Sequence, residues 1–321
     1  MSRIGLIYPN GEIGVAQIQT AVDFVRRHGT SVEQTRLNVL MGSAEGTSEA
    51  INELARDQRE DGGWAPFWAQ DASSVDATCY RLAQCEQLGL TNHKMIGRAI
   101  AFLANHQHRE GSLEEQQELA SVAPPWALPG DLAAKIYLTA NAGYWIFYYQ
   151  PKALALPRIA QFLTAHIDPC GKMPSFLHAH WLTAGLLYGL GAKTGAQHIM
   201  DALRVRLSEL EASNLAWMIN GLSVMGVAPH SPLITDALIK LVSLQHANGH
   251  WSNEDGDEKD VHTTLEALRA ISFVHPLVDA PVRNRAGEVA IPPAGSLPDV
   301  YPESVTDVPP LHDEADQDTV L

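Results

Sequence analysis

Two short segments share one frame, in which an ionisable side chain stands two residues before a threonine. They are Ser74-Val-Asp76-Ala-Thr78 and Asp260-Val-His262-Thr-Thr264. Carboxyl and imidazole groups donate and accept protons in reactions when their surroundings set a suitable pKa. Both segments open stretches of helical periodicity. Asp76 is also the acid of a capping-box pattern, Ser73-Ser-Val-Asp76, and His262 also fits a plain histidine at a helix start, so each candidate has a structural alternative.

A repeated motif, Gln-x3-Gly-x-Trp, precedes both segments. It reads Gln58-Arg-Glu-Asp-Gly-Gly-Trp64 and Gln245-His-Ala-Asn-Gly-His-Trp251, and weaker copies are Gln107-His-Arg-Glu-Gly-Ser-Leu113 and Ile167-Asp-Pro-Cys-Gly-Lys-Met173. We expect the glutamine and tryptophan to tie the end of one helix to the start of the next. The glycine lets the backbone turn where a Cβ would clash. Such copies must stack, because one helical hairpin cannot bury its own apolar faces.

Apolar residues recur at three- and four-residue spacing, which predicts helices from one end of the body to the other. The expected helices are 13–28, 32–42, 47–60, 73–88, 93–107, 130–149, 151–167, 175–190, 194–211, 213–226, 231–247 and 260–273. They pair into six hairpins, which predicts an all-α domain over residues 1–275 that closes into an α/α toroid. A long open solenoid is the alternative architecture.

Closure would give every inner helix the same direction. The amino ends of the inner helices would then meet at one mouth, together with their unpaired amides and positive dipole ends. Site candidates are therefore the helix starts: 73–78, the region around Asp131, 175–181, 213–217 and 260–264.

The repeats together with the first segment resemble the squalene-hopene cyclase and class II terpene cyclase family. That family carries an Asp-x-Asp-Asp-Thr signature at an inner helix start, and its middle aspartate is the proton donor. Aligned on Thr78, this chain keeps the middle aspartate as Asp76 and has Ser74 and Ala77 at the flanking acid positions. The resemblance covers roughly residues 45–275. It implies a general acid at Asp76, with His262 as its orienting partner and Asp260 as a further catalytic candidate.

Protonating an alkene or epoxide requires a carboxylic acid in a mostly apolar cavity, with aromatic faces for the carbocation. The aromatic candidates for binding such a substrate are Phe67, Trp68, Trp126, Tyr144, Trp181 and Trp217. Core packing is the alternative role for any one of them. The expected substrate is an isoprenoid, and protonation itself needs no cofactor or metal.

Protein prenyltransferase β subunits share the toroid and bind zinc through an Asp-x-Cys pair and a later histidine. Asp168-Pro-Cys170 with His262 resembles that set. However, Asp168 and Cys170 fall in a motif turn instead of at an inner helix start, so a structural turn is the favoured interpretation.

The densest acidic run in the body is Glu254-Asp-Gly-Asp-Glu-Lys-Asp260. Its oxygens could hold Mg²⁺ if the substrate carries a diphosphate. The alternative is a solvated loop.

Composition excludes other classes. A formal net charge of -15 argues against nucleic acid and against a polybasic membrane patch. Cys79, Cys85 and Cys170 are too few and too irregular for a disulfide framework, and no apolar run is long enough for a signal peptide or a membrane span. We expect a cytoplasmic protein with a proline-rich acidic tail, 276–321, that is extended or disordered.

A class II cyclase usually has a second barrel that closes the site. This chain is long enough for only a single barrel. The tail, the loop 112–130, or another subunit of a homo-oligomer or partner would have to cover the mouth. The sequence therefore predicts a terpene cyclase-like enzyme that starts cyclisation or isomerisation by proton transfer from Asp76. The alternatives are a non-catalytic toroid that binds a prenyl chain or a protein, and a zinc-dependent prenyltransferase.

Overall fold

The structure is a computed structural model that describes residues 3–7, 13–43, 46–275 and 277. The described residues belong to one compact unit. The expected tail, 276–321, lies outside the described residues apart from Leu277, so its character stays a prediction. Within the described part of the chain, no helix is long and apolar enough to cross a membrane.

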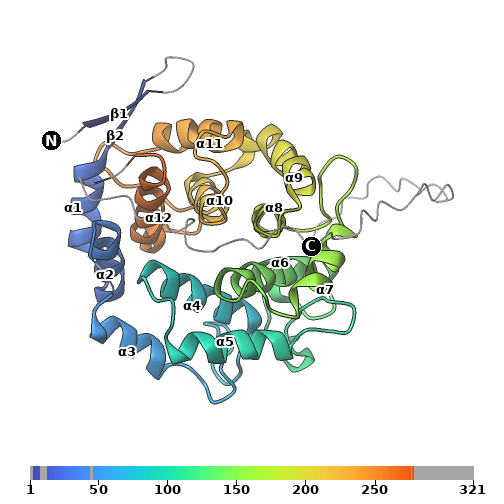
Figure 1. Ribbon diagram of the computed structural model, residues 1–321. Helices are drawn as coiled ribbons and strands as arrows, with labels where there is room; N and C mark the ends of the chain where they lie inside the picture. Colours follow the sequence, from blue (N-terminus) through green and yellow to red (C-terminus); the bar gives the residue numbers. More distant parts are fainter. Residues whose placement is uncertain (1–2, 8–12, 44–45, 276, 278–321) are drawn as a thin grey trace, which may run out of the picture. The chain divides into compact units, whose positions relative to one another are not determined.

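The described residues form twelve α-helices, which confirms the predicted all-α class (Figure 1). They are α1 (Ile18–His28), α2 (Ser31–Leu40), α3 (Ser48–Arg56), α4 (Val75–Gln87), α5 (Lys94–Asn105), α6 (Leu132–Tyr149), α7 (Leu156–Thr164), α8 (Leu177–Gly189), α9 (Lys193–Val205), α10 (Ala212–Val224), α11 (Pro232–Ser243) and α12 (Asp260–Ser272). Each corresponds to one predicted helix.

One prediction at the amino end is wrong. The helix expected over 13–28 begins only at Ile18, because Ile13–Gln17 forms strand β2, which pairs antiparallel with β1 (Arg3–Ile7). The segment contains a glycine and β-branched residues, which favour a helix only weakly, so backbone pairing with β1 prevails.

The even-numbered helices form an inner layer. Each of them contacts the next even-numbered helix along the chain, and α12 contacts α2, so that the contacts close into a cycle. The odd-numbered helices pack outside this layer. In Figure 1, α4, α10 and α12 lie nearer the centre, while α1, α3, α5 and α11 lie around them.

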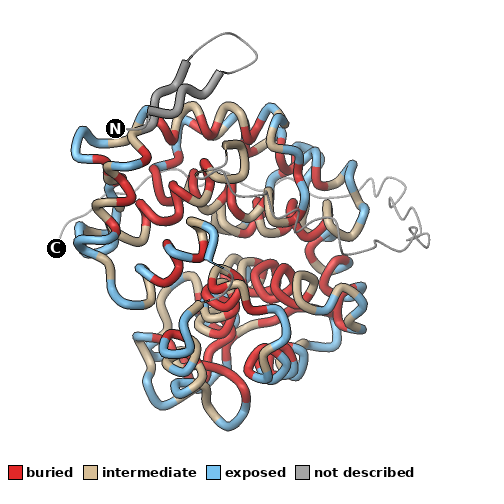
Figure 2. Tube along the Cα trace, turned by 60° about the vertical axis from the view of Figure 1, so that its left-hand side comes forward, coloured by how far each residue is buried: buried red, intermediate tan, exposed pale blue. Residues whose placement is uncertain are grey.

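The burial patterns explain the two layers. Outer helix α1 buries Ile18, Ala21, Val22 and Val25, a spacing that covers one face only. Inner helix α6 is buried on all sides, since every residue from 138 to 146 is buried. Figure 2 shows the same contrast between continuous buried stretches inside and alternating exposure outside.

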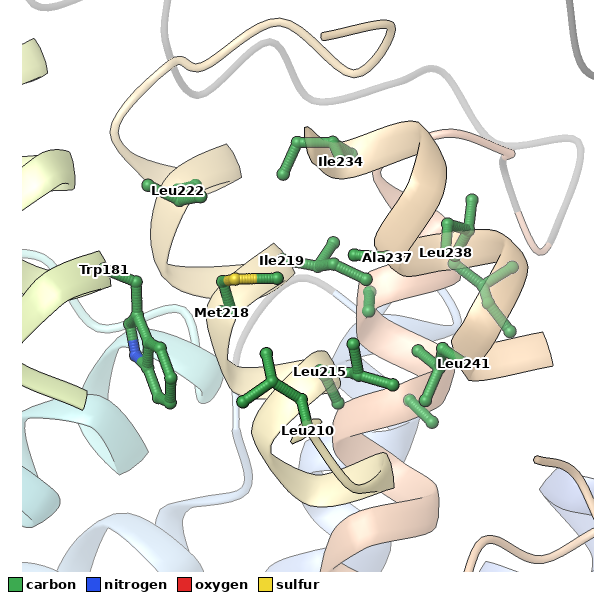
Figure 3. Packing of buried hydrophobic residues seen from close by; sticks show 14 of the residues in the cluster. Trp181, Leu210, Leu215, Met218, Ile219, Leu222, Ile234, Ala237, Leu238 and Leu241 are labelled. Atoms are coloured by element: carbon green, nitrogen blue, oxygen red, sulfur yellow. The ribbon is translucent and has the colours of Figure 1, made fainter. Parts of the chain in front are cut away.

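The hydrophobic core fills the space between the layers. Figure 3 shows Ile219 of α10 pointing toward Ala237 of α11, and Leu215 pointing toward Leu241. On the other side of α10, Trp181 of α8 completes the same buried cluster. Each inner helix is therefore held by an outer helix and by both of its inner neighbours.

The motif glycines sit where the backbone of another helix approaches. Gly62 and Gly249 have φ values of 97° and 94°, a region that disfavours side chains. A Cβ on Gly62 would lie 2.5 Å from the carbonyl oxygen of Arg98, and one on Gly249 would lie 2.6 Å from the carbonyl carbon of Thr20. The sequence prediction that a Cβ would clash in these turns is confirmed.

The motif glutamines tie each turn to the next outer helix. Gln58 Nε2 donates to the carbonyls of Gly62 and Met95, both at 2.8 Å. Gln245 Nε2 donates to Gly249 at 2.8 Å and to Gln17 at 3.2 Å, and its Oε1 accepts the Gln17 N–H at 2.8 Å. Because Gln17 directly precedes α1, the last motif joins the last repeat to the first.

Candidate active site

Rings from five inner helices follow one another around the interior of the cycle. The distances between successive ring centroids are 6.1 Å for Tyr137–His178, 5.6 Å for His178–Trp217, 6.0 Å for Trp217–His262 and 6.3 Å for His262–Tyr80. We call these five residues the aromatic collar. Tyr80 is 48% exposed although it lies on inner helix α4, so about half of this collar side chain is accessible to solvent.

Asp76 of α4 lies beside the collar, and both of its carboxylate oxygens accept hydrogen bonds. The Tyr137 hydroxyl donates to Oδ1 at 2.9 Å, and the Trp126 indole N–H donates to Oδ2 at 3.1 Å. Asn141 Nδ2 in turn donates to the Tyr137 oxygen at 3.3 Å, which leaves the phenol proton for Asp76. The carboxyl group is thus oriented by two donors from outside its own helix.

Two opposing effects set the acidity of Asp76. Burial raises its pKa above the usual value, while the bonds from Tyr137 and Trp126 act in the opposite direction by stabilising the carboxylate. Burial also raises the pKa of the Tyr137 phenol, which therefore stays a neutral donor. A carboxyl in this environment holds a proton more readily than an exposed one and still has a stabilised conjugate base.

The capping alternative for Asp76 is wrong. The N-cap of α4 is Ser74, whose Oγ accepts the Ala77 N–H at 3.1 Å, while Ser73 bonds to Asp61 instead. The helix-start amides are served by another acid, Glu115, which accepts from the N–H groups of residues 75 and 76 at 2.9 and 3.0 Å. The Asp76 carboxyl is therefore not used by its own helix.

Glu115 was not found from the sequence. It is 3% exposed and also accepts the Ser74 hydroxyl at 2.6 Å. Burial raises its pKa to about 7, with the nearby Asp76 charge acting in the same direction and the three hydrogen bonds against it. The sequence signal for Glu115 is its place shortly after the weak motif copy that ends at Leu113.

One hydrogen bond recurs in four repeats and reveals equivalent positions. The N–H of the residue two after each motif glycine donates to a side chain on an inner helix, in the pairs Trp64–Thr78, Leu113–Thr139, Met173–His180 and Trp251–Thr264. The residues two positions earlier on these helices are Asp76, Tyr137, His178 and His262. Tyr137 could thus have been found by aligning Thr139 with Thr78 through the weak motif.

His262 is in the collar, but the pairing with Asp76 expected from the sequence is wrong. Its Nδ1 faces Arg36 Nη1 at 3.3 Å, and its Nε2 lies 4.0 Å from Glu266. Helix α2 packs between α12 and α4 and brings Arg36 to the imidazole. Burial first, and then the Arg36 charge, lowers the pKa of His262, so the ring is neutral near pH 7.

The catalytic candidate Asp260 bonds to the turn that precedes its helix. Its Oδ1 accepts the Asn253 N–H at 2.7 Å, and its Oδ2 lies 3.3 Å from His250 Nε2. Asp260 thus holds the turn that leads into α12 and does not join the collar residues.

The predicted aromatic candidates divide into three groups. Trp217 belongs to the collar, Trp126 bonds to Asp76, and Trp181 is buried with its ring 4.6 Å from His178. Tyr144 is buried elsewhere on α6 and donates to the Gly221 carbonyl at 2.9 Å. The two from the loop before α4 differ: Trp68 is half-buried with an indole N–H that bonds to no described residue, and Phe67 is 81% exposed.

Buried charges occupy the inner helices about one turn beyond the collar. Arg36 Nη2 lies 2.6 Å from Glu266 Oε1, and the two side chains are 2% and 4% exposed. Gln87 and Asn220 also donate to Glu266, and Arg269 pairs with Glu86. Burial is the largest effect and would raise the pKa of Glu266, but the nearby Arg36, His262 and Arg269 together with the Gln87 hydrogen bond outweigh burial, and the pKa is lowered.

The residues weighed as alternative metal ligands bond to groups of the protein itself. Asp168 Oδ1 accepts the N–H groups of Cys170 and Lys172, both at 2.8 Å, as the turn interpretation expected. In the acidic run, Glu254 accepts from Ser213 and Asn214, and Asp255 pairs with Lys259. Among the described residues, no group of three or more His, Cys, Asp or Glu side chains is placed to hold a metal ion.

The fold is similar to that of solved type II terpene cyclases. One is MstE from Scytonema in complex with geranylgeranyl dihydroxybenzoate, an arginine-to-alanine variant, at 16% identity and a TM-score of 0.53 over 83% of this chain and 89% of that one. Apo MstE is 15% identical, with a TM-score of 0.53 over 86% of this chain and 92% of that one. A protein from Actinoplanes is 16% identical, with a TM-score of 0.51 over 84% of this chain and 92% of that one. No protein-family model and no curated protein sequence matches the chain.

Proposed function

We propose that this protein is a terpene cyclase-like enzyme that starts cyclisation or isomerisation of an isoprenoid by proton transfer from Asp76. The observation that carries the proposal is the position of the Asp76 carboxyl, which Tyr137 and Trp126 hold beside the aromatic collar. Burial raises the pKa of this carboxyl. The similarity to MstE, solved with a geranylgeranyl substrate, supports an isoprenoid ligand. We further propose that the cycle of inner helices is an α/α toroid whose mouth carries Asp76.

In the proposed reaction, the Asp76 proton adds to one carbon of an alkene. The π electrons form the new C–H bond, and the other carbon becomes a cation that a second alkene of the same chain attacks to close a ring. Asp76 is left as a carboxylate, which the Tyr137 and Trp126 donors stabilise. The cation meets the faces of collar rings, whose quadrupoles attract positive charge without forming a bond to it.

The loop between α5 and α6 is proposed to cover the site. Trp126 lies in a 3-10 turn of this loop, Pro125–Ala127, and its bond to Asp76 fixes the turn over the carboxyl. Excluding water there matters, because water would capture the cation. This proposal assigns to the loop the role that a second barrel has in larger cyclases.

Replacement of Asp76 by Asn tests the proposed function. The purified protein is incubated with a panel of prenyl diphosphates and uncharged polyprenes, and substrate loss and products are measured by gas chromatography with mass spectrometry. The variant keeps the shape of the side chain but has no acidic proton, so we expect turnover to fall by about 10²–10⁴-fold.

The matched control is Asp168→Asn, an aspartate whose Oδ1 accepts two N–H groups of its own turn. It should keep wild-type turnover. Unchanged product formation by Asp76→Asn would reject Asp76 as the donor. A wild-type protein that binds isoprenoids and converts none of them would instead indicate a non-catalytic prenyl-binding toroid.

A further inference from the structure

His178 occupies the same place on α8 as Asp76 occupies on α4. Each stands two residues before the side chain that accepts the N–H of its motif turn, His180 for Met173 and Thr78 for Trp64. The His178 ring lies within the collar and against Trp181, at a centroid distance of 4.6 Å. Tyr137 lies between the two residues, because its ring is 6.1 Å from that of His178 and its hydroxyl donates to Asp76 at 2.9 Å.

Both ring nitrogens of His178 are free of hydrogen bonds to the described residues, unlike those of the other inner-helix histidines at the site. His180 uses both nitrogens, since Nε2 accepts from Met173 at 3.0 Å and Nδ1 lies 3.1 Å from the Phe176 carbonyl. His262 faces Arg36 with Nδ1 and Glu266 with Nε2. His178 is thus the collar imidazole with a lone pair that no donor among the described residues occupies.

The His178 imidazole is also uncharged, which is the protonation state that can accept a proton. Burial lowers the pKa of His178 to about 4, and the Asp255 charge opposes this effect only in part. The ring is therefore an uncharged base across the neutral range. A neutral imidazole among aromatic rings is compatible with a carbocation nearby, whereas an imidazolium would repel it.

We propose that His178 is the catalytic base that ends the reaction, an inference that rests on the proposed function. A C–H bond next to the cationic carbon breaks, its electrons form a C=C bond, and the proton passes to a ring nitrogen of His178. One proton has then entered from Asp76 and one has left to His178. The product is a cyclic alkene isomeric with the substrate, and solvent exchange returns the proton balance of both residues.

The test compares the products of wild type and His178→Phe on the substrate that wild type converts. Phe keeps a ring in the collar but removes the base. We expect substrate consumption within tenfold of wild type, since Asp76 is intact, and at least a tenfold fall in the proportion of the wild-type alkene. Isomeric alkenes, formed when the cation loses a different proton, or alcohols, formed when water adds to the cation, should take its place.

His198→Phe on outer helix α9 is the matched control, because His198 is exposed, and it should leave the product unchanged. His178→Asn serves if the Phe variant does not fold, as judged by its thermal melt. An unchanged alkene proportion overturns the base assignment, and so does loss of substrate consumption in a folded variant. If wild type itself converts no substrate, the proposed function has failed instead.

Discussion

The Tyr137 hydroxyl lies 2.9 Å from Asp76 Oδ1 and joins two neighbouring inner helices, α6 and α4. The bond links residues 61 positions apart in sequence. Because Asn141 donates to the same phenol oxygen, the phenol proton is directed at the carboxyl. Tyr137 is thus a positioning residue for the proposed acid.

Replacing Tyr137 by Phe should weaken Asp76 as an acid. A hydrogen bond to a charged group contributes about 1.5–3 kcal/mol, so we expect turnover to fall by about 10- to 100-fold. Without this donor, the carboxylate is less stable and the pKa of Asp76 rises further. The loss of activity at high pH should then begin at a higher pH than in wild type, as measured by a pH–rate profile.

Tyr188→Phe is the control for this change, since its ring lies on the same kind of inner helix but contacts Lys193. It should leave both turnover and the pH profile unaltered. A Tyr137→Phe enzyme with the wild-type rate and profile would contradict the positioning role.

Replacing Glu115 by Gln should change how stability depends on pH. The folded-state pKa of about 7 exceeds the ordinary 4.5, so folded Glu115 holds a proton that the unfolded chain has lost between these values. Its contribution therefore favours folding at low pH and is lost as pH rises from about 4.5 to about 7. The shift corresponds to a change of at most about 3.5 kcal/mol.

Urea denaturation of both proteins at pH 5 and pH 8 measures this effect. We expect the free energy of unfolding of Glu115→Gln minus that of wild type to be larger at pH 8 than at pH 5. Any constant cost of placing an amide beside the α4 amides cancels in that difference. Parallel pH dependences for the two proteins would mean that Glu115 titrates normally.

Removing one partner of the Arg36–Glu266 pair should be costly, because the remaining charge stays buried. We expect Arg36→Met to lower the free energy of unfolding by about 3–5 kcal/mol. The double variant Arg36→Met with Glu266→Met should lose less than the sum of the two single variants. Urea denaturation of the three variants measures this coupling. Additive losses would argue that the two charges are independent.

Replacing Gln245 by Leu tests the tie between the last repeat and the first. The side chain makes hydrogen bonds to Gly249 and to both backbone groups of Gln17, so we expect a loss of about 2 kcal/mol. Hydrogen exchange of the α1 amides should become faster. Gln107→Leu is the matched control, because it bonds to Ala155 and should affect α7 instead. Equal exchange of α1 in both variants would contradict a closing role for Gln245.

The sequence by itself determined the class of fold and the location of Asp76. Helical periodicity and the Gly-x-Trp turns are local properties, because they depend on residues a few positions apart, and every predicted helix is present. Alignment of Thr78 with Thr264 through the motif also identified Asp76 and His262. Asp76 lies beside the collar, and His262 belongs to it.

Only the tertiary structure decided what surrounds the acid. Trp126, Tyr137 and Glu115 reach α4 from other repeats, and no local pattern specifies which side chains meet across neighbouring inner helices. The same reason explains the wrong pairing of His262, since Arg36 of α2 packs against it. Periodicity fixes which face of a helix is buried, whereas the partner on that face depends on how the helices pack into a cycle.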